Sequence, residues 1–280
     1  MDYALPCVTA LLATVLYLNT LSAGFAYDDS RAIQKNPDLL PETPLWNLAY
    51  DDFWGTPLTH SGSHKSYRPL CVLTFRLNYL LGELDPWGYH LGNVLCHAVT
   101  TAIFTLFVQA LFVGSSGNSR SSKLAGSKEK QSNGPESGAA CSPPVGLIDA
   151  SRIGPASAGL LFAAHPIHTE AVAGIVGRAD VLSCLFFLLT LLSYIHYVRV
   201  RHSAEPGWRV LPALLTALLS ASAMVTKEPA IMALAVCVVY DILVVHKATP
   251  RDIFTFAVFT QARTRSCHAK GQPVTAQWSL

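Results

Sequence analysis

Two adjacent carboxylates follow the first apolar run of the chain, in the stretch YDDSR at 27–31. A carboxylate that lies beside a second carboxylate and a membrane surface can have a raised pKa, and such a group can serve as a general base. Asp28 and Asp29 are therefore candidate catalytic residues. The same pair could instead end a helix and solvate a loop, and the residues alone leave both interpretations open.

Charged residues also occur in three further stretches beside apolar runs, namely SHKSYRPL (63–70), HPIHTEAVAGIVGRAD (165–180) and TKEP (226–229). Ionisable groups at membrane depth are costly, so they usually face a water-filled cavity or a functional site. Lysine and arginine hold phosphate through charge-assisted hydrogen bonds. The pattern therefore predicts a site for an anionic, membrane-bound substrate. Its candidate binding residues are Lys65, Arg68, Arg178, Lys227 and the neighbouring Glu228.

Two histidines in the third stretch are possible site residues. His165 and His168 are three residues apart, which keeps them on about the same face of a helix. Pro166 lies between them and could break that helix. A pair of histidines without further ligands is a weak signal for zinc, so we expect no metal.

The composition indicates an integral membrane protein. Of 280 residues, 51% are hydrophobic and 14% are charged, and the mean hydropathy is +0.34. Soluble proteins carry about 25% charged residues. The net charge of +2 says nothing about nucleic acid, but no basic block with interleaved aromatic residues is present, so we expect no nucleic-acid partner. The seven cysteines show no CxxC spacing, so neither a disulfide framework nor a zinc site is indicated.

Apolar runs of about 20 residues predict an all-α polytopic fold. The first run is expected to be a retained anchor rather than a cleaved signal. Lysine and arginine concentrate in 114–155 and in the connections that follow the spans 181–198 and 229–246. This places these connections in the cytoplasm. Loop 26–88 is then lumenal. The predicted spans are 5–25, 89–113, 156–177, 181–198, 210–226 and 229–246.

The chain divides into four parts by composition. The first two spans and their lumenal loop occupy 1–113. Segment 114–155 is rich in Ser, Gly and Lys and cannot bury a core, which predicts a disordered cytoplasmic linker. Further spans occupy 156–260, and an atypical polar tail occupies 261–280.

The motifs YDDSRAI, SHKSYRPL, HPIHTEAVAGIVGRADVL and TKEPAI resemble the transmembrane and tetratricopeptide-repeat-containing (TMTC) proteins, the second paralogue in particular. The resemblance covers about residues 5–260 apart from the linker. It implies part of a GT-C-type helical domain and a multi-pass O-mannosyltransferase of the endoplasmic-reticulum membrane. The implied donor is dolichyl phosphate mannose, no cofactor is implied, and the implied acceptor is Ser or Thr of cadherin-type domains. The resemblance also favours Asp28 over Asp29 as the base and implies a donor-site element of Glu170, Arg178 and Asp180.

Two features differ from the resembled family. No tetratricopeptide repeat of 34 residues occurs in the sequence, and the apolar run 253–259 is too short to span a bilayer. We therefore expect a truncated chain that transfers mannose poorly or not at all. The alternative is a non-enzymatic membrane adaptor of the reticulum, for example for a calcium pump. A transporter fits less well, because the polar groups cluster at one membrane face rather than at the midplane.

Overall fold

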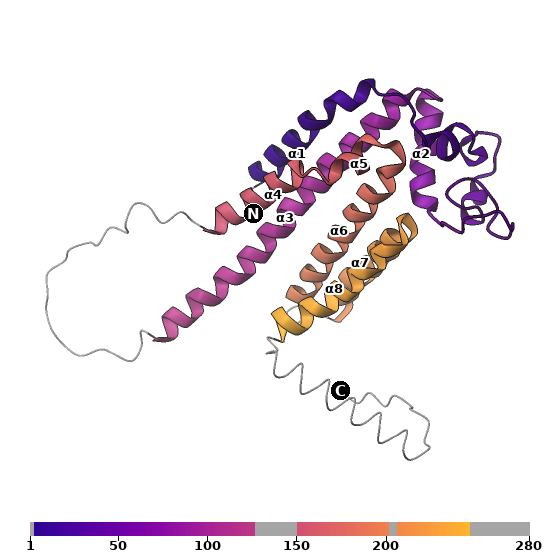
Figure 1. The fold of residues 1–280 in the computed structure, drawn as a ribbon. Coiled ribbons are helices and arrows are strands. Elements are labelled where there is room, and N and C mark those ends of the chain that lie inside the picture. Colours follow the sequence, from indigo (N-terminus) through magenta and orange to yellow (C-terminus); the bar gives the residue numbers. More distant parts are fainter. Residues whose placement is uncertain (1–2, 127–149, 202–205, 247–280) are drawn as a thin grey trace, which may run out of the picture. The chain divides into compact units, whose positions relative to one another are not determined.

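The computed structural model describes residues 3–126, 150–201 and 206–246, and the regular structure in these ranges is helical (Figure 1). An isolated β-bridge joins Asp51 to Pro57 in the first loop. The chain divides into two compact units, Met1–Ala233 and Leu234–Leu280. All of the candidate site residues named above belong to the first unit.

Helices long and apolar enough to cross a bilayer confirm the prediction of an all-α multi-span fold. Within the described residues there are four of them: Ala4–Ser22, Pro86–Phe112, Ile175–Val200 and Glu228–Val245. A shorter apolar helix covers Val210–Thr226, where a further span is predicted.

The predicted span over 156–177 is not one continuous helix. Helix α4 (Ala150–Ala164) ends before Pro166, and α5 (His168–Ala173) and the short turn η5 (Ile175–Gly177) follow as separate elements. Proline lacks a backbone N–H, and its ring disfavours helical geometry in the residue before it, so the break falls at this point. The prediction of a single span here is therefore wrong.

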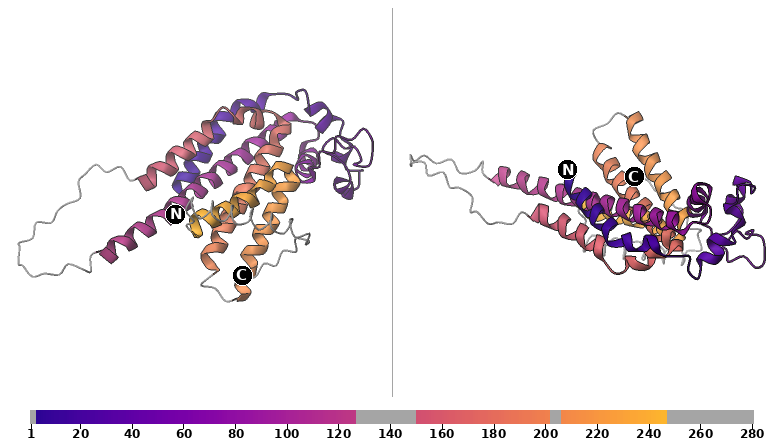
Figure 2. Two further views of the ribbon diagram at one scale, coloured as in Figure 1. Left: turned by 60° about the horizontal axis from the view of Figure 1, so that its bottom comes forward. Right: turned by 90° about the horizontal axis from the view of Figure 1, so that it is seen from above.

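Helix α1 (Ala4–Tyr17), the long helix α3 (Pro86–Gly126) and α4 all contact one another, and Figure 1 and the left view of Figure 2 show the three running side by side. Their contact uses small residues. The Oγ1 atoms of Thr9 and Thr105 lie 3.0 Å apart. A Cβ atom on Gly159 would lie 2.5 Å from Thr105 Oγ1, so the three helices meet where only glycine fits.

Helices α6 (Arg178–Val200) and α7 (Pro206–Thr226) pack against each other, and α6 also packs against α3. On the outer faces of α1 and α7 large apolar side chains are exposed, for example Leu11 at 64% and Leu218 at 64%. Apolar exposure of this extent is the expected lipid-facing surface of a membrane helix.

Loop 26–88 folds against the ends of these helices rather than extending into solvent. It contains three short turns and one longer helix: η2 (Ser30–Gln34), η3 (Pro37–Leu39), η4 (Leu45–Ala49) and α2 (Pro69–Gly82). Phe53 and Phe75 are 1% and 0% exposed and join Tyr89 and Ile175 in one apolar core. Burial of each such aromatic side chain contributes about 1.5–3 kcal/mol, so the loop is held as a defined cap.

Helix α3 extends through residues 114–126, the first part of the predicted linker. Once a helix is nucleated, adding each further residue costs little free energy, so an apolar helix can continue into a polar segment. Residues 127–149 of the predicted linker and all of the tail 261–280 lie outside the described residues. The second unit contains most of α8 (Met232–Tyr240), and η7 (Asp241–Val245) follows that helix.

Candidate functional site

The two adjacent acids of the first loop have different environments. Asp29 is 2% exposed, and its carboxylate accepts hydrogen bonds from the backbone N–H groups of Ala26 at 2.8 Å and Val176 at 3.3 Å. Burial raises the pKa of Asp29, although these two N–H groups act in the opposite direction. Asp28 is exposed and lines a cavity. Asp29 therefore joins the first loop to η5, whereas Asp28 is the member of this pair that lines the cavity.

The guanidinium of Arg178 is enclosed by protein. The residue is 2% exposed and lies over the ring of Phe75, with Cζ 4.7 Å from the ring centroid. Its N–H groups donate to Asn93 Oδ1 (2.7 Å), Asn78 Oδ1 (2.6 Å), Thr74 Oγ1 (3.3 Å) and the Tyr89 carbonyl (2.7 Å). These bonds connect α2, α3 and α6 from inside. The structure thus gives Arg178 a positioning role instead of the predicted contact with phosphate.

Lys65 lies away from the cavity. Its Nζ donates to the carbonyl oxygens of Leu58 and His60 within the first loop, the second at 3.1 Å. Its backbone φ of 58° is in the left-handed region, which is uncommon for a residue other than glycine. Lys65 therefore lies outside the group of cations that the structure brings together.

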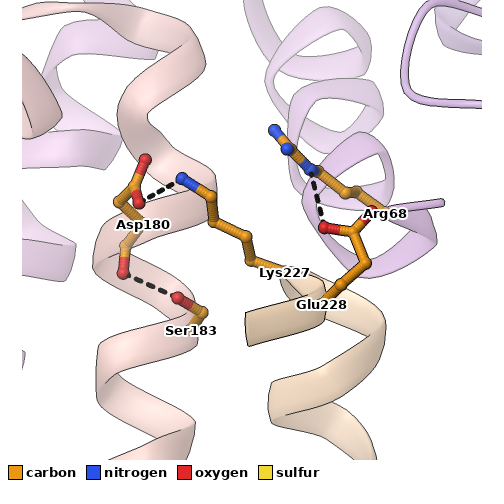
Figure 3. Close-up of polar contacts among 5 residues, drawn as sticks. All are labelled: Arg68, Asp180, Ser183, Lys227 and Glu228. Carbon is orange, nitrogen blue, oxygen red and sulfur yellow. Dashed lines mark hydrogen bonds and ion pairs between the residues drawn. The ribbon is translucent and has the colours of Figure 1, made fainter. Parts of the chain in front are cut away.

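Among the residues that the structure describes, Arg68 and Lys227 are the Arg and Lys side chains that line the cavity, and each has a carboxylate partner (Figure 3). Arg68 Nε lies 3.8 Å from Glu228 Oε2. Lys227 Nζ donates to Asp180 Oδ1. Arg68 immediately precedes α2, Asp180 is in the first turn of α6, and Lys227 follows α7. Three elements distant in sequence therefore meet through these pairs.

The cavity has a volume of about 750 Å³ and combines charged and apolar walls. Its ionisable wall contains Asp28, Arg68, Glu170, Asp180, Lys227, His97 and His168. Its apolar and aromatic wall includes Phe53, Trp54, Phe162, Ile167, Val176 and Val181. A cavity of this size with both kinds of wall suits a ligand that has a charged or hydroxylated head and an apolar chain.

His168 faces this cavity, whereas His165 lies outside its lining. The His168 ring centroid is 5.0 Å from that of His97 and 4.4 Å from that of Phe162. His165 Nδ1 instead accepts a hydrogen bond from the N–H of Ile167. Over the described ranges, no group of three or more His, Cys, Asp or Glu side chains is placed to hold a metal ion.

The floor of the cavity depends on one close approach of two backbones. A Cβ atom on Gly177 would lie 2.5 Å from the carbonyl oxygen of Ala171. Real Cβ contacts are longer, so only glycine allows α5 to fold back against the start of α6. Gly174 and Gly177 themselves line the cavity.

Sequence reasoning did not identify the aromatic wall. That wall depends on Asp52, which is 1% exposed and organises the turn that carries Phe53 and Trp54. Its carboxylate accepts bonds from Ser63 Oγ at 2.6 Å and from the N–H groups of Trp54, Thr56 and His64. Burial alone would raise the pKa of Asp52, but these hydrogen bonds lower it overall. The only sequence signal was the high aromatic content of the loop.

The curated proteins that are similar to this chain belong to the family that its sequence motifs resemble. It is 48% identical over 248 residues to "Protein O-mannosyl-transferase tmtc2" of Xenopus laevis, which covers 89% of the chain and 25% of that protein. It is 46% identical over 232 residues to "Protein O-mannosyl-transferase Tmtc1" of Drosophila melanogaster (83% and 22%), and 42% identical over 240 residues to "Protein O-mannosyl-transferase TMTC3" of Homo sapiens (85% and 21%). The chain thus spans about a quarter of the length of these relatives. No family model matches it, and no solved structure matches it significantly.

Proposed function

We propose that this chain, a homologue of the TMTC protein O-mannosyl-transferases, builds a site where mannose passes from a lipid phosphate to a protein hydroxyl. The observation that supports this most is the set of charges in one cavity. The exposed acid Asp28 and the cations Arg68 and Lys227 come from separate segments and line the same space. The names of the relatives describe a transferase and do not favour the membrane adaptor considered as the alternative.

The donor that fits this cavity is dolichyl phosphate mannose, and the proposed setting is the endoplasmic-reticulum membrane. A lipid-linked donor needs one part of the site for its phosphate and sugar and an apolar wall for its chain. Arg68 and Lys227 supply the first part, and residues such as Phe162 and Val181 supply the second. We further propose a GT-C-type arrangement and a Ser or Thr of a cadherin-type domain as the acceptor.

The reaction is a single displacement with inversion at the anomeric carbon. The acceptor hydroxyl attacks that carbon, a new carbon–oxygen bond forms, and the bond to the phosphate oxygen breaks. Asp28 takes the hydroxyl proton as general base. Arg68 and Lys227 stabilise the negative charge that develops on the leaving lipid phosphate.

Binding tests this proposal directly. The purified 280-residue chain, in lipid nanodiscs, is irradiated with a photoreactive analogue of dolichyl phosphate mannose, and the labelled peptides are mapped by mass spectrometry. We expect labelling near the cavity walls, and its loss when Arg68→Gln and Lys227→Gln are combined. Lys65→Gln is the matched control, because that lysine lies outside the cavity lining. Equal labelling of the double variant and the wild type would contradict the proposal.

A further inference from the structure

Two neighbouring residues at the start of η6 (Glu228–Ile231) connect opposite sides of the cavity (Figure 3). Lys227 has an extended backbone, with φ −157° and ψ 129°, so its side chain and that of Glu228 point in different directions. Lys227 reaches Asp180 on α6, and Glu228 reaches Arg68 at the start of α2. Lys227 is therefore one of the two cations of the cavity, and Glu228 forms an ion pair with the other cation, Arg68.

Each cavity cation is accompanied by a carboxylate in this arrangement. The side chains of Arg68 and Lys227 are 22% and 27% exposed, and those of Glu228 and Asp180 are 50% and 49% exposed. Asp28 and Glu170 add negative charge to the same cavity. An incoming anion must therefore compete with Asp180 for Lys227 and with Glu228 for Arg68.

The strength of that competition depends on the charge of the anion. Coulomb attraction to the cations and repulsion from the carboxylates both double between a singly and a doubly charged phosphate, so the net charge of the site decides the preference. The two cations Arg68 and Lys227 face four carboxylates, those of Asp28, Glu170, Asp180 and Glu228, so the net interaction is repulsive and grows with the charge of the ligand. A phosphodiester carries one negative charge. A phosphomonoester carries about −1.5 to −2 at pH 7.

From these contacts we propose that Asp180 and Glu228 act as internal counterions that make the cavity favour a singly charged phosphodiester over a doubly charged phosphomonoester. This inference rests on the proposed function, in which the donor is a phosphodiester and the spent lipid is a phosphomonoester. Both carboxylates then determine specificity and promote release of the spent lipid. Neither is required to touch the sugar.

A purely structural role for the two ion pairs makes a different prediction. If the pairs served only to hold α2, η6 and α6 together, loss of either carboxylate would loosen the cavity and weaken every ligand. Under the counterion role, the same loss frees a cation and strengthens the binding of anions. The sign of the change in affinity therefore separates the two roles.

The experiment uses two ligands that differ by one charge, citronellyl phosphate and its methyl ester. Neither carries a sugar, so contacts to mannose do not affect the result. Their affinities for the full chain in nanodiscs are measured by calorimetry. We expect the wild type to prefer the methyl ester. Asp180→Asn should raise affinity for the monoester by about tenfold and for the methyl ester by about threefold, values discounted for the partial exposure of the pair.

Glu228→Gln should change the two affinities in the same direction, since it frees Arg68. Glu42→Gln is the matched control, because it removes an exposed carboxylate of the first loop that does not line the cavity, and it should change neither affinity. A reduced or unchanged monoester affinity in Asp180→Asn, or equal gains for both ligands, would overturn the counterion role. If neither ligand binds to the wild type, or if Lys227→Gln and Arg68→Gln leave binding intact, the proposed function fails instead.

Discussion

Substitution of Arg178 by lysine tests the conclusion that this buried arginine positions helices and does not bind the ligand. Lysine keeps the positive charge but lacks the planar fork that reaches several acceptors at once. The side chain of Arg178 is 2% exposed and donates to Asn93, Asn78, Thr74 and the Tyr89 carbonyl. A lysine ammonium cannot reach all of these acceptors from the same backbone position.

The magnitude follows from the acceptors that lose their donor. A buried polar group left without a partner costs about 1–3 kcal/mol, and hydrogen bonds to charged groups are at the upper end of this range. If two of the acceptors are lost, Arg178→Lys should lower the free energy of unfolding by roughly 3–5 kcal/mol, similar to the effect of breaking other buried charge networks. Part of the cation–π contact with Phe75 at 4.7 Å is retained by the ammonium.

The assay is thermal unfolding of the detergent-solubilised chain, followed by tryptophan fluorescence and by size-exclusion chromatography. Arg68→Lys is the matched control, because the Arg68 side chain is 22% exposed and has one carboxylate partner, so this substitution should change stability by less than about 1 kcal/mol. A variant Arg178→Lys that unfolds like the wild type but fails to bind the donor analogue would refute the reasoning. Arg178 would then contact the ligand.

Three further predictions follow from single features of the structure. Burial and the nearby Asp51 raise the pKa of Asp38 to about 7, above its ordinary value of 3.8. The charged form is therefore disfavoured in the fold, so stability should fall as pH rises from about 4 to about 7 and level off above that. Asp38→Asn should raise the unfolding temperature at pH 8 much more than at pH 5, and equal effects at both pH values would contradict this. Gly177→Ala places a Cβ atom 2.5 Å from the Ala171 carbonyl oxygen, so it should reduce labelling by the donor analogue and lower the unfolding temperature. Gly24→Ala is the control: its Cβ atom meets nothing within 4 Å, so it should change neither labelling nor the unfolding temperature. An Asn-x-Ser/Thr acceptor sequence introduced at the exposed Gly62 should be glycosylated in microsomes. The same sequence introduced at Asn133, which is outside the described residues, should not be glycosylated. The reverse pattern would overturn the predicted lumenal position of loop 26–88.

The membrane fold could be predicted from the sequence because hydropathy and helix length are local properties. The expected spans at the first run, at 89–113 and at 181–198 all correspond to helices long enough to cross a bilayer. The division near Pro166 was harder to place. Whether a proline kinks a helix or ends it depends on the neighbouring helices that receive the freed backbone groups, and these contacts are not local.

The roles of individual site residues depended on long-range contacts. Asp28 and Asp29 are identical in type and adjacent in sequence, and the N–H of Val176, 147 residues away, is one of the contacts that sets Asp29 apart. Arg178 and Arg68 were equivalent candidates for a phosphate. The acceptors that enclose Arg178 come from α2 and α3, so its burial could not be read from the stretch GRAD.

The residues that sequence reasoning missed are ordinary in their local context. His97 lies in an apolar helix, where nothing in the local sequence marks it as a site residue, and it lines the cavity beside His168. Phe53 and Trp54 reach the cavity because the buried carboxylate of Asp52 shapes their turn. Such second-layer hydrogen bonds have no signature in the spacing of residues.

The central claim, that Asp28 is the base for mannosyl transfer, is tested most directly by the rate of transfer itself. In a full-length TMTC relative that carries the YDDSR motif, the aspartate matching Asp28 is replaced by asparagine, and mannose incorporation into a cadherin-type domain is measured by mass spectrometry. An amide keeps the size of the side chain but cannot accept the proton, so the rate should fall by about 10²–10⁴-fold while labelling by the donor analogue is unchanged. A variant that transfers mannose at the rate of the wild type would contradict the account and would return Asp28 to the role of a solvated helix terminus.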